Sequence, residues 1–251
     1  MGELTKLMKP YYMPIAIYRS KDFPSYASKP SGSHCIFDSM FMPAIRDGKT
    51  VASSSATVGC AGALNGLGFG GEDKANRDLL MVGYSTGNEK REGRGLFKDP
   101  ETANRNYRDK VPVYGDDGDY IVFQPLDEAE AMNAPIEVVA FLSDPTEISA
   151  LVTLACYSRP FDDSIIRSSF ALSCEQMYAM ARQENETDCP RMVLGGTEFH
   201  VRGIIDPDKM VLSIPYKLYS VMEKDAPGSF LRDDRWRKAV APKKCEKCCC
   251  D

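Results

Sequence analysis

Residues 136–147, Ile-Glu-Val-Val-Ala-Phe-Leu-Ser-Asp-Pro-Thr-Glu, place an apolar run directly before a helix start. The run over 136–142 is rich in β-branched and aromatic side chains, which favours a buried strand. The following Asp144-Pro145-Thr-Glu147 puts a proline in the first turn of a helix and acidic side chains at the positive end of its dipole. We therefore expect a strand over 136–142 and then a helix through about Cys156.

The same alternation of strand and helix extends to both sides of this stretch. Apolar patterning predicts strands near residues 14–18, 51–58, 120–123 and 165–172, and helices over 35–45, from about Gly59, after Asp99 and from Ser173. The segment over residues 88–118, rich in Lys, Arg, Glu, Gly and Asp, is expected to be mostly solvated. Strands that alternate with helices predict an α+β fold built on a mixed sheet.

The second half of the chain resembles the first half. When residues 51–60 are aligned with 165–174 at a constant offset of 114, two serines and the cysteine coincide. Residues 119–125 also resemble 208–215, with one residue of slip. Because these matches keep the order of the elements, we predict a duplicated architecture of two pseudo-twofold-related halves. Cys60 and Cys174 would then occupy equivalent places.

The composition is that of an ordinary globular protein with a slight acidic excess. The chain has 251 residues, of which 43% are hydrophobic, and its 31 Lys and Arg against 36 Asp and Glu give a net charge of -5. This balance argues against a dedicated nucleic-acid binder. No apolar stretch reaches the roughly 18 residues of a membrane span, and the N-terminus lacks a signal-peptide layout, so we expect a cytoplasmic protein without membrane contact. We predict a single compact domain over residues 10–230, with halves of about 10–130 and 131–230, and a basic, cysteine-rich tail over 231–251.

The cysteines are the candidate functional residues. There are nine, an odd number in a long chain, which argues against a secreted disulfide framework. Cys60 and Cys174 are each predicted where a strand ends and a helix begins, a position at which the helix dipole lowers the pKa of a thiol. Cys35, at the start of the preceding helix, would supply a third sulfur. Three convergent thiolates suit an iron-sulfur cluster, or a zinc ion with one open position. Alternatively, these cysteines merely pack where helices meet the sheet.

Other residues carry weaker signals. Cys189 is a candidate fourth metal ligand, because a Cys-Pro step such as Cys189-Pro190 closes many ferredoxin motifs. Cys156 is expected in the core. The thiols of Cys245, Cys248, Cys249 and Cys250 form either a metal-capture arm, a redox-active cluster or a disordered terminus whose last seven residues are dispensable for folding. The glycines of residues 66–71 are interpreted as a tight turn with close backbone approach rather than as a nucleotide-binding loop.

An ordered series of short motifs runs along most of the chain. The motifs are Pro14-Ile-Ala-Ile, Cys35, Gly59-Cys60-Ala-Gly-Ala with Leu67-Gly68, Phe97 with Glu101, Pro125-Leu126, Pro135-Ile-Glu-Val-Val with Pro145-Thr-Glu, Ser173-Cys174-Glu175, Gly195-Gly196 and Ile214-Pro215. Over about residues 10–225 this series resembles the bacterial and archaeal family called domain of unknown function 169. The family has no assigned reaction, so the resemblance implies the fold and the importance of the cysteines without an activity. It also implies a further cysteine near Gly195 in many relatives, which this chain lacks, and this departure makes Cys189 a compensating ligand to test.

Three functions are open on these residues. The leading hypothesis is a protein that binds an iron-sulfur cluster, or another thiolate-held metal cofactor, at the interface of the two halves, with a redox partner or a small-molecule ligand. The second is a small-molecule enzyme with Cys60 or Cys174 as a low-pKa nucleophile and no metal. The third is a non-catalytic scaffold with buried structural cysteines. A visible spectrum with metal analysis separates the first hypothesis from the other two.

Overall fold

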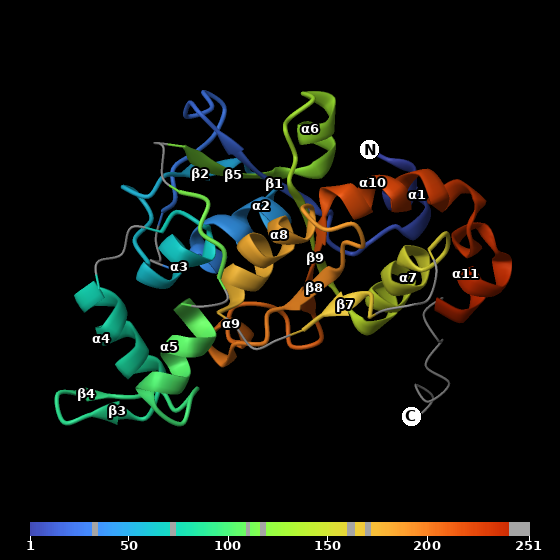
Figure 1. Cartoon of the computed structure of the whole chain (residues 1–251). Coiled ribbons are helices and arrows are strands. Elements are labelled where there is room, and N and C mark those ends of the chain that lie inside the picture. The colour runs from blue at the N-terminus through green and yellow to red at the C-terminus, as the bar shows by residue number, and fades with distance from the viewer. Residues whose placement is uncertain are drawn as a thin grey trace, which may run out of the picture.

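One mixed sheet with helices on both faces makes up the fold (Figure 1). The computed structural model describes residues 1–31, 35–70, 74–108, 111–115, 119–159, 164–168 and 172–240. Within these residues the sheet has seven strands in the order β2-β5-β1-β6-β9-β8-β7, and a separate hairpin pairs β3 with β4. The α+β fold predicted from the sequence is therefore confirmed.

The bounds of the elements follow the chain. The strands are β1 (Ile15–Ser20), β2 (Val51–Ser53), β3 (Gly87–Asn88), β4 (Arg91–Glu92), β5 (Tyr120–Pro125), β6 (Val138–Ser143), β7 (Ile166–Arg167), β8 (Met192–Gly195) and β9 (Met210–Pro215). The α-helices are α1 (Glu3–Met8), α2 (Met42–Asp47), α3 (Ala61–Gly66), α4 (Lys74–Tyr84), α5 (Pro100–Arg108), α6 (Leu126–Ala131), α7 (Pro145–Ala155), α8 (Met180–Glu184), α9 (Phe199–Arg202), α10 (Tyr216–Asp225) and α11 (Asp234–Val240). Two π-helical segments, η1 (Phe37–Phe41) and η2 (Glu175–Ala179), lead into α2 and α8, and two 3₁₀ turns, η3 (Ala226–Gly228) and η4 (Phe230–Arg232), precede α11.

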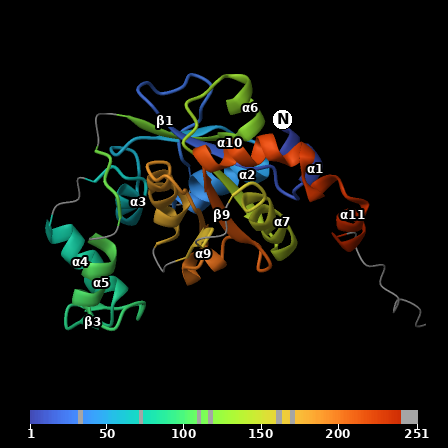
Figure 2. The same ribbon diagram turned by 45° about the vertical axis from the view of Figure 1, so that its right-hand side comes forward.

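The sheet separates two cores. Because successive strand residues point to opposite faces, Ile15 and Ile17 of β1 join one core while Ala16 and Tyr18 join the other. The first core packs beneath η1 and α2, α3, and η2 and α8; the second packs beneath α1, α6, α7 and α10. At one end of the molecule α4, α5 and the β3–β4 hairpin lie together, away from α11 (Figures 1 and 2). The cysteines discussed below belong to the first core.

The strand predicted over 136–142 and the helix predicted after it are both present. β6 is buried along its whole length, and α7 begins at Pro145 directly after it. The Asp144 carboxylate accepts a hydrogen bond from Glu147 N at 2.9 Å, and the Glu147 carboxylate accepts one from Asp144 N at 3.2 Å. This reciprocal capping satisfies two amides that the first helical turn leaves unpaired. The helix predicted after Asp99 is also present as α5.

Two predicted strands are shorter than expected. The predicted strand 51–58 ends at Ser53, because Ser54 and Thr57 close a turn in which Ser54 N donates to Thr57 Oγ1 at 2.9 Å. The predicted strand 165–172 is β7, and the sequence-based bounds reach residues 169–171, which lie outside the described residues. The tail is predicted over 231–251, but residues 231–240 form the end of η4 and α11, and Leu231 is buried in the second core. Residues 241–251 lie outside the described residues.

The strand pairing contradicts the expected match of residues 51–60 with 165–174. β2 pairs antiparallel with β5 and is bridged on its other side, in parallel, by Ser28, whereas β7 is an edge strand parallel to β8. The two segments therefore have different neighbours, and Cys60 is not equivalent to Cys174 by position in the sheet. The two serines and the cysteine that coincide at the offset of 114 therefore do not mark equivalent positions in the sheet.

β5 and β2 on one side of the central β1–β6 pair are arranged like β9 and β8 on its other side. Pro125 of β5 stands opposite Ile15 of β1, and Pro215 of β9 stands opposite Val138 of β6. The parallel partners of β2 and β8 are Ser28 and Arg167, and Cys35 and Cys174 each follow seven residues later. The two-halves architecture stays a prediction, and within it this register would make Cys35, rather than Cys60, the counterpart of Cys174.

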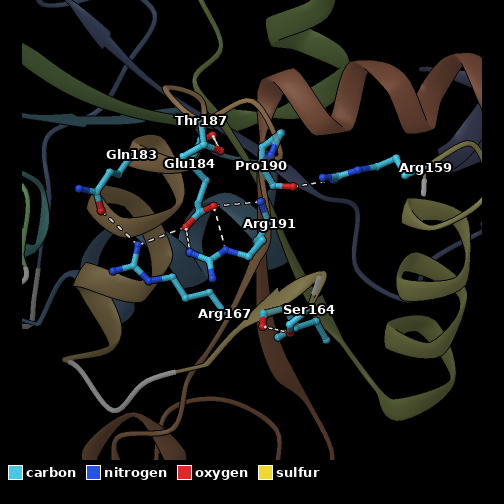
Figure 3. A network of polar contacts seen from close by, with 9 residues as sticks. Arg159, Ser164, Arg167, Gln183, Glu184, Thr187, Pro190 and Arg191 are labelled. Carbon is cyan, nitrogen blue, oxygen red and sulfur yellow. Dashed lines mark hydrogen bonds and ion pairs between the residues drawn. The ribbon is translucent and has the colours of Figure 1, made fainter. Parts of the chain in front are cut away.

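A buried carboxylate fixes the helix that carries Cys174 to the edge of the sheet (Figure 3). Glu184, at the end of α8, is only 2% exposed. Its oxygens accept hydrogen bonds from Arg167 Nη1 on β7 at 3.3 Å and from Arg191 Nη2 at 2.9 Å. Arg191 N adds a further hydrogen bond at 3.1 Å. Since a buried charge is tolerated only when it is paired and hydrogen-bonded, this network locks α8 to β7 and β8.

Candidate functional site

Three of the predicted cysteines line one pocket. Cys35, Cys60 and Cys174 come from segments far apart in the chain and border the same pocket of about 440 Å³. We call it the three-cysteine pocket. Cys174 is buried, whereas Cys35 and Cys60 are partly exposed. The structure therefore brings the three thiols together at one solvent-connected site.

Each of the three cysteines stands at the start of a helical segment, as the sequence predicts. Cys60 caps α3 with an extended backbone, and Cys174 lies directly before η2. Cys35 precedes the helical run that contains η1. π-Helical turns are rare and are frequently found at functional sites, so their presence behind both Cys35 and Cys174 sets this region apart.

The glycines of α3 allow the helix to lie against Cys174. A Cβ atom at Gly66 would lie 2.5 Å from Cys174 Sγ, and one at Gly62 would lie 3.0 Å from the Tyr84 hydroxyl. Cys174 Sγ donates a weak hydrogen bond to Gly62 O at 3.4 Å. The interpretation of these glycines as sites of close backbone approach is therefore correct, and Gly68, with φ of 75°, provides the turn that follows.

Burial determines the charge state of two of the thiols. It raises the pKa of Cys174 well above the usual thiol value, and the neighbouring Glu175 adds to the effect. Burial also raises the pKa of Cys35, against the opposing influence of the Phe37 and Asp38 N–H groups. The expectation that a helix start lowers the thiol pKa is therefore wrong for Cys174, because desolvation of its thiolate costs more than the short helical segment stabilises it.

Polar groups accompany the thiols at the inner side of the pocket. Ser173 N donates to Glu198 Oε2 at 3.3 Å, and Leu172 N donates to Glu175 Oε2 at 3.1 Å. Burial raises the pKa of the Glu175 carboxyl well above its usual range, although the Leu172 N–H opposes the shift. The Ser173 hydroxyl is buried and has no hydrogen-bond partner among the described residues. The residue borders the pocket, although the hydroxyl itself is buried.

Two arginines and a histidine border the outer side of the same pocket. Arg91 lies on β4, Arg94 follows the β3–β4 hairpin, and His200 lies on α9. All three are exposed. The Arg94 guanidinium lies 5.7 Å from the centre of the Tyr84 ring. No local sequence pattern links these arginines to the cysteines, because only the folded β3–β4 hairpin brings them to the pocket.

The remaining cysteine candidates lie elsewhere. Cys189 is exposed in the turn before β8 and does not line the pocket, so it is set aside as a fourth ligand. Cys156 is the C-cap residue of α7 and is partly exposed, so the expectation that it lies in the core is wrong. Over the described ranges, no group of three or more His, Cys, Asp or Glu side chains has an arrangement that could hold a metal ion as it stands. The tail cysteines lie outside those ranges.

The family profile of domain of unknown function 169 (DUF169), described as "Uncharacterised ArCR", matches residues 3–225. The chain belongs to this family. No curated protein and no solved structure matches the chain. The resemblance drawn from the short motifs is therefore confirmed, and all three pocket cysteines lie within the matched part of this DUF169 member.

The position at which the resemblance implies a further cysteine lies beside the three-cysteine pocket without lining it. Gly195 ends β8, and a Cβ atom there would lie 2.9 Å from the Cβ of Gln176 on η2. Gln176 Nε2 donates in turn to Thr197 Oγ1 at 3.1 Å. This DUF169 member thus has a polar, closely packed contact at that point.

No helix in the described part of the chain is long and apolar enough to cross a membrane.

Proposed function

We propose that the three-cysteine pocket binds a cofactor through the thiolates of Cys35, Cys60 and Cys174, with an iron-sulfur cluster as the leading candidate and zinc as the alternative. The observation that carries the proposal is the meeting of three thiols from three separate segments in one pocket. Cysteine thiolates are the standard ligands of iron-sulfur clusters, and three of them leave one iron open. Three protein ligands with one open position also describe a catalytic zinc site.

The electrostatic coupling of the thiols supports their treatment as one unit. Burial is the main cause of the raised pKa of Cys174 and of Cys35; charge on Cys60 adds to both, and charge on Cys35 adds to that of Cys174. Such mutual repulsion between thiolates is relieved when a cation binds between them. The volume of about 440 Å³ lies within the range of small-molecule pockets, about 300–1,000 Å³, and so leaves space for a ligand beside the cofactor.

A second candidate function is an enzyme that uses a pocket thiol as a nucleophile without a metal. It is favoured by the arrangement of the described side chains, which form no metal-holding group as they stand. Cys60 is the natural nucleophile, because it is partly exposed to the pocket while Cys174 is buried with a raised pKa.

Anaerobic purification with iron, acid-labile sulfide and zinc analysis tests the proposal. The background is a chain that ends at Lys244, so that the tail thiols do not contribute metal. We expect cofactor content to be lost in Cys35→Ser, Cys60→Ser and Cys174→Ser variants and retained in Cys189→Ser, the matched exposed control. The proposal fails if the protein holds no iron, sulfide or zinc after anaerobic reconstitution, or if the pocket variants load as well as the control. Stoichiometric alkylation of Cys60 in metal-free protein that cannot be reconstituted would support the second candidate.

A further inference from the structure

The two arginines of the three-cysteine pocket are held in place by contacts that leave their charge uncompensated. Arg91 Nη1 donates to Leu79 O of α4 at 3.2 Å, and its guanidinium lies over Gly83, where a Cβ atom would be 2.9 Å from Arg91 Nε. Arg94 N donates to Gly83 O at 2.9 Å, while its guanidinium faces the Tyr84 ring. Among the ion pairs of the described residues, none includes Arg91 or Arg94. Two cations are therefore held against the end of α4, at the border of the pocket.

The charges that line the pocket are unequal. Arg91 and Arg94 are cationic, and Glu198 is the one carboxylate among the described lining residues. Glu198 is nearly buried and already accepts a hydrogen bond from Ser173 N, so it belongs to the inner side. The exposed arginines belong to the outer side. Anions that approach from solvent therefore meet a positive rim.

The inside of the pocket offers apolar surface and one unused hydroxyl. Phe37, Leu80 and Leu172 line it together with the thiols. The Ser173 Oγ atom is buried, the residue being 1% exposed, and has no partner within the described residues. Because buried polar groups in proteins are almost always hydrogen-bonded, the Ser173 hydroxyl is an unsatisfied donor beside the pocket.

From these three observations we propose that the pocket takes a small organic carboxylate. Its anionic group binds Arg91 and Arg94, and its body extends along the apolar wall towards Ser173 and the thiols. Arginine suits this task because its planar fork matches a carboxylate with two parallel hydrogen bonds. The inference rests on the proposed function in taking this pocket as the functional site, but it does not require a bound cofactor.

A charge-matched pair of alkylating reagents tests the proposal on the metal-free, reduced full chain. In both reactions the thiolate sulfur displaces iodide, so that a sulfur–carbon bond forms, the carbon–iodine bond breaks and the thiol proton passes to solvent. Iodoacetate carries a carboxylate, whereas iodoacetamide is neutral. The ratio of their rates at Cys60, measured site by site by mass spectrometry, reports attraction of the anion. The exposed Cys189 is the internal reference in the same chain.

We expect the iodoacetate-to-iodoacetamide ratio at Cys60 to exceed that at Cys189 by about three- to tenfold, given the modest strength of partly exposed charge pairs. The double variant Arg91→Gln/Arg94→Gln should lower the Cys60 ratio to the Cys189 value. Arg91→Lys/Arg94→Lys, which keeps both charges, should retain most of it. Lys90→Gln, in the same hairpin but outside the pocket lining, should change nothing.

Three outcomes overturn the inference: equal ratios at Cys60 and Cys189, a Cys60 ratio that the Arg-to-Gln variant leaves unchanged, or a Cys60 that reacts with neither reagent. Competition at constant ionic strength separates the anion classes, because benzoate should protect Cys60 while inorganic phosphate should not. Equal protection by phosphate would replace the carboxylate with a phosphate ligand. Cofactor content of the Arg-to-Gln variant should equal that of the parent, so failure of this inference and failure of the cofactor proposal give different results.

Discussion

Gly66→Ala should destabilise the protein, because α3 has no space for a methyl group where it crosses Cys174. The added Cβ atom would lie 2.5 Å from Cys174 Sγ and 2.9 Å from the backbone nitrogen of Glu175. Normal carbon contacts lie at about 3.5–4.0 Å. The sulfur can move by a small rotation of its side chain, but the Glu175 amide belongs to η2 and cannot. Either α3 or the π-helical segment must therefore shift.

The magnitude follows from two opposing effects. Overpacking of a dense core costs about 1–3 kcal/mol. Replacing a helical glycine with alanine returns about 0.5–1 kcal/mol, because alanine loses less conformational freedom on folding. We expect a net loss of about 1–2 kcal/mol in the free energy of unfolding, which corresponds to a decrease of about 2–8 °C in Tm for a chain of this size.

Urea and thermal unfolding followed by circular dichroism, in reducing and metal-free buffer, measure this loss. Gly203→Ala is the matched control, because the nearest atom to its Cβ position is His200 O at an ordinary 3.5 Å. Adding Cys174→Ala removes the closest contact, so the double variant should recover at least about 0.5 kcal/mol relative to additivity. A Gly66→Ala protein as stable as the parent, or strict additivity in the double variant, would refute the close packing of α3 on Cys174.

The same unfolding measurements check three further predictions. Asp144→Ala removes the side-chain cap of α7 and should cost about 1 kcal/mol; an unchanged midpoint would contradict the capping geometry. Glu184→Gln leaves Arg167 and Arg191 without the carboxylate that binds them in Figure 3 and should cost about 1–3 kcal/mol, whereas the exposed Glu186→Gln should stay within about 0.5 kcal/mol; equal effects of the two would refute the importance of burial. Phe141→Ala, in the middle of the sheet, should cost about 3–5 kcal/mol, and a loss below that of Asp144→Ala would contradict its core position.

The sequence by itself determined the elements whose signals lie within a few residues of one another. β6 and α7 follow from an apolar run and the cap formed by Asp144 and Glu147, and these are present as expected. The helix starts at Cys35, Cys60 and Cys174 were also predictable, because strand ends and helix starts leave local patterns. Even so, a short match of serines and a cysteine suggested the wrong equivalence between Cys60 and Cys174.

Only the tertiary structure decided which segments became neighbours. The pairing of β1 with β6, and of β2 with β5, depends on hydrogen bonds between residues far apart in the chain, and no local pattern specifies such partners. Burial is likewise a property of the whole fold, which is why the pKa of Cys174 rises where the local helix start predicted a fall. Arg91 and Arg94 reach the pocket because their hairpin folds back on α4, and a sequence read in order gives no sign of that contact.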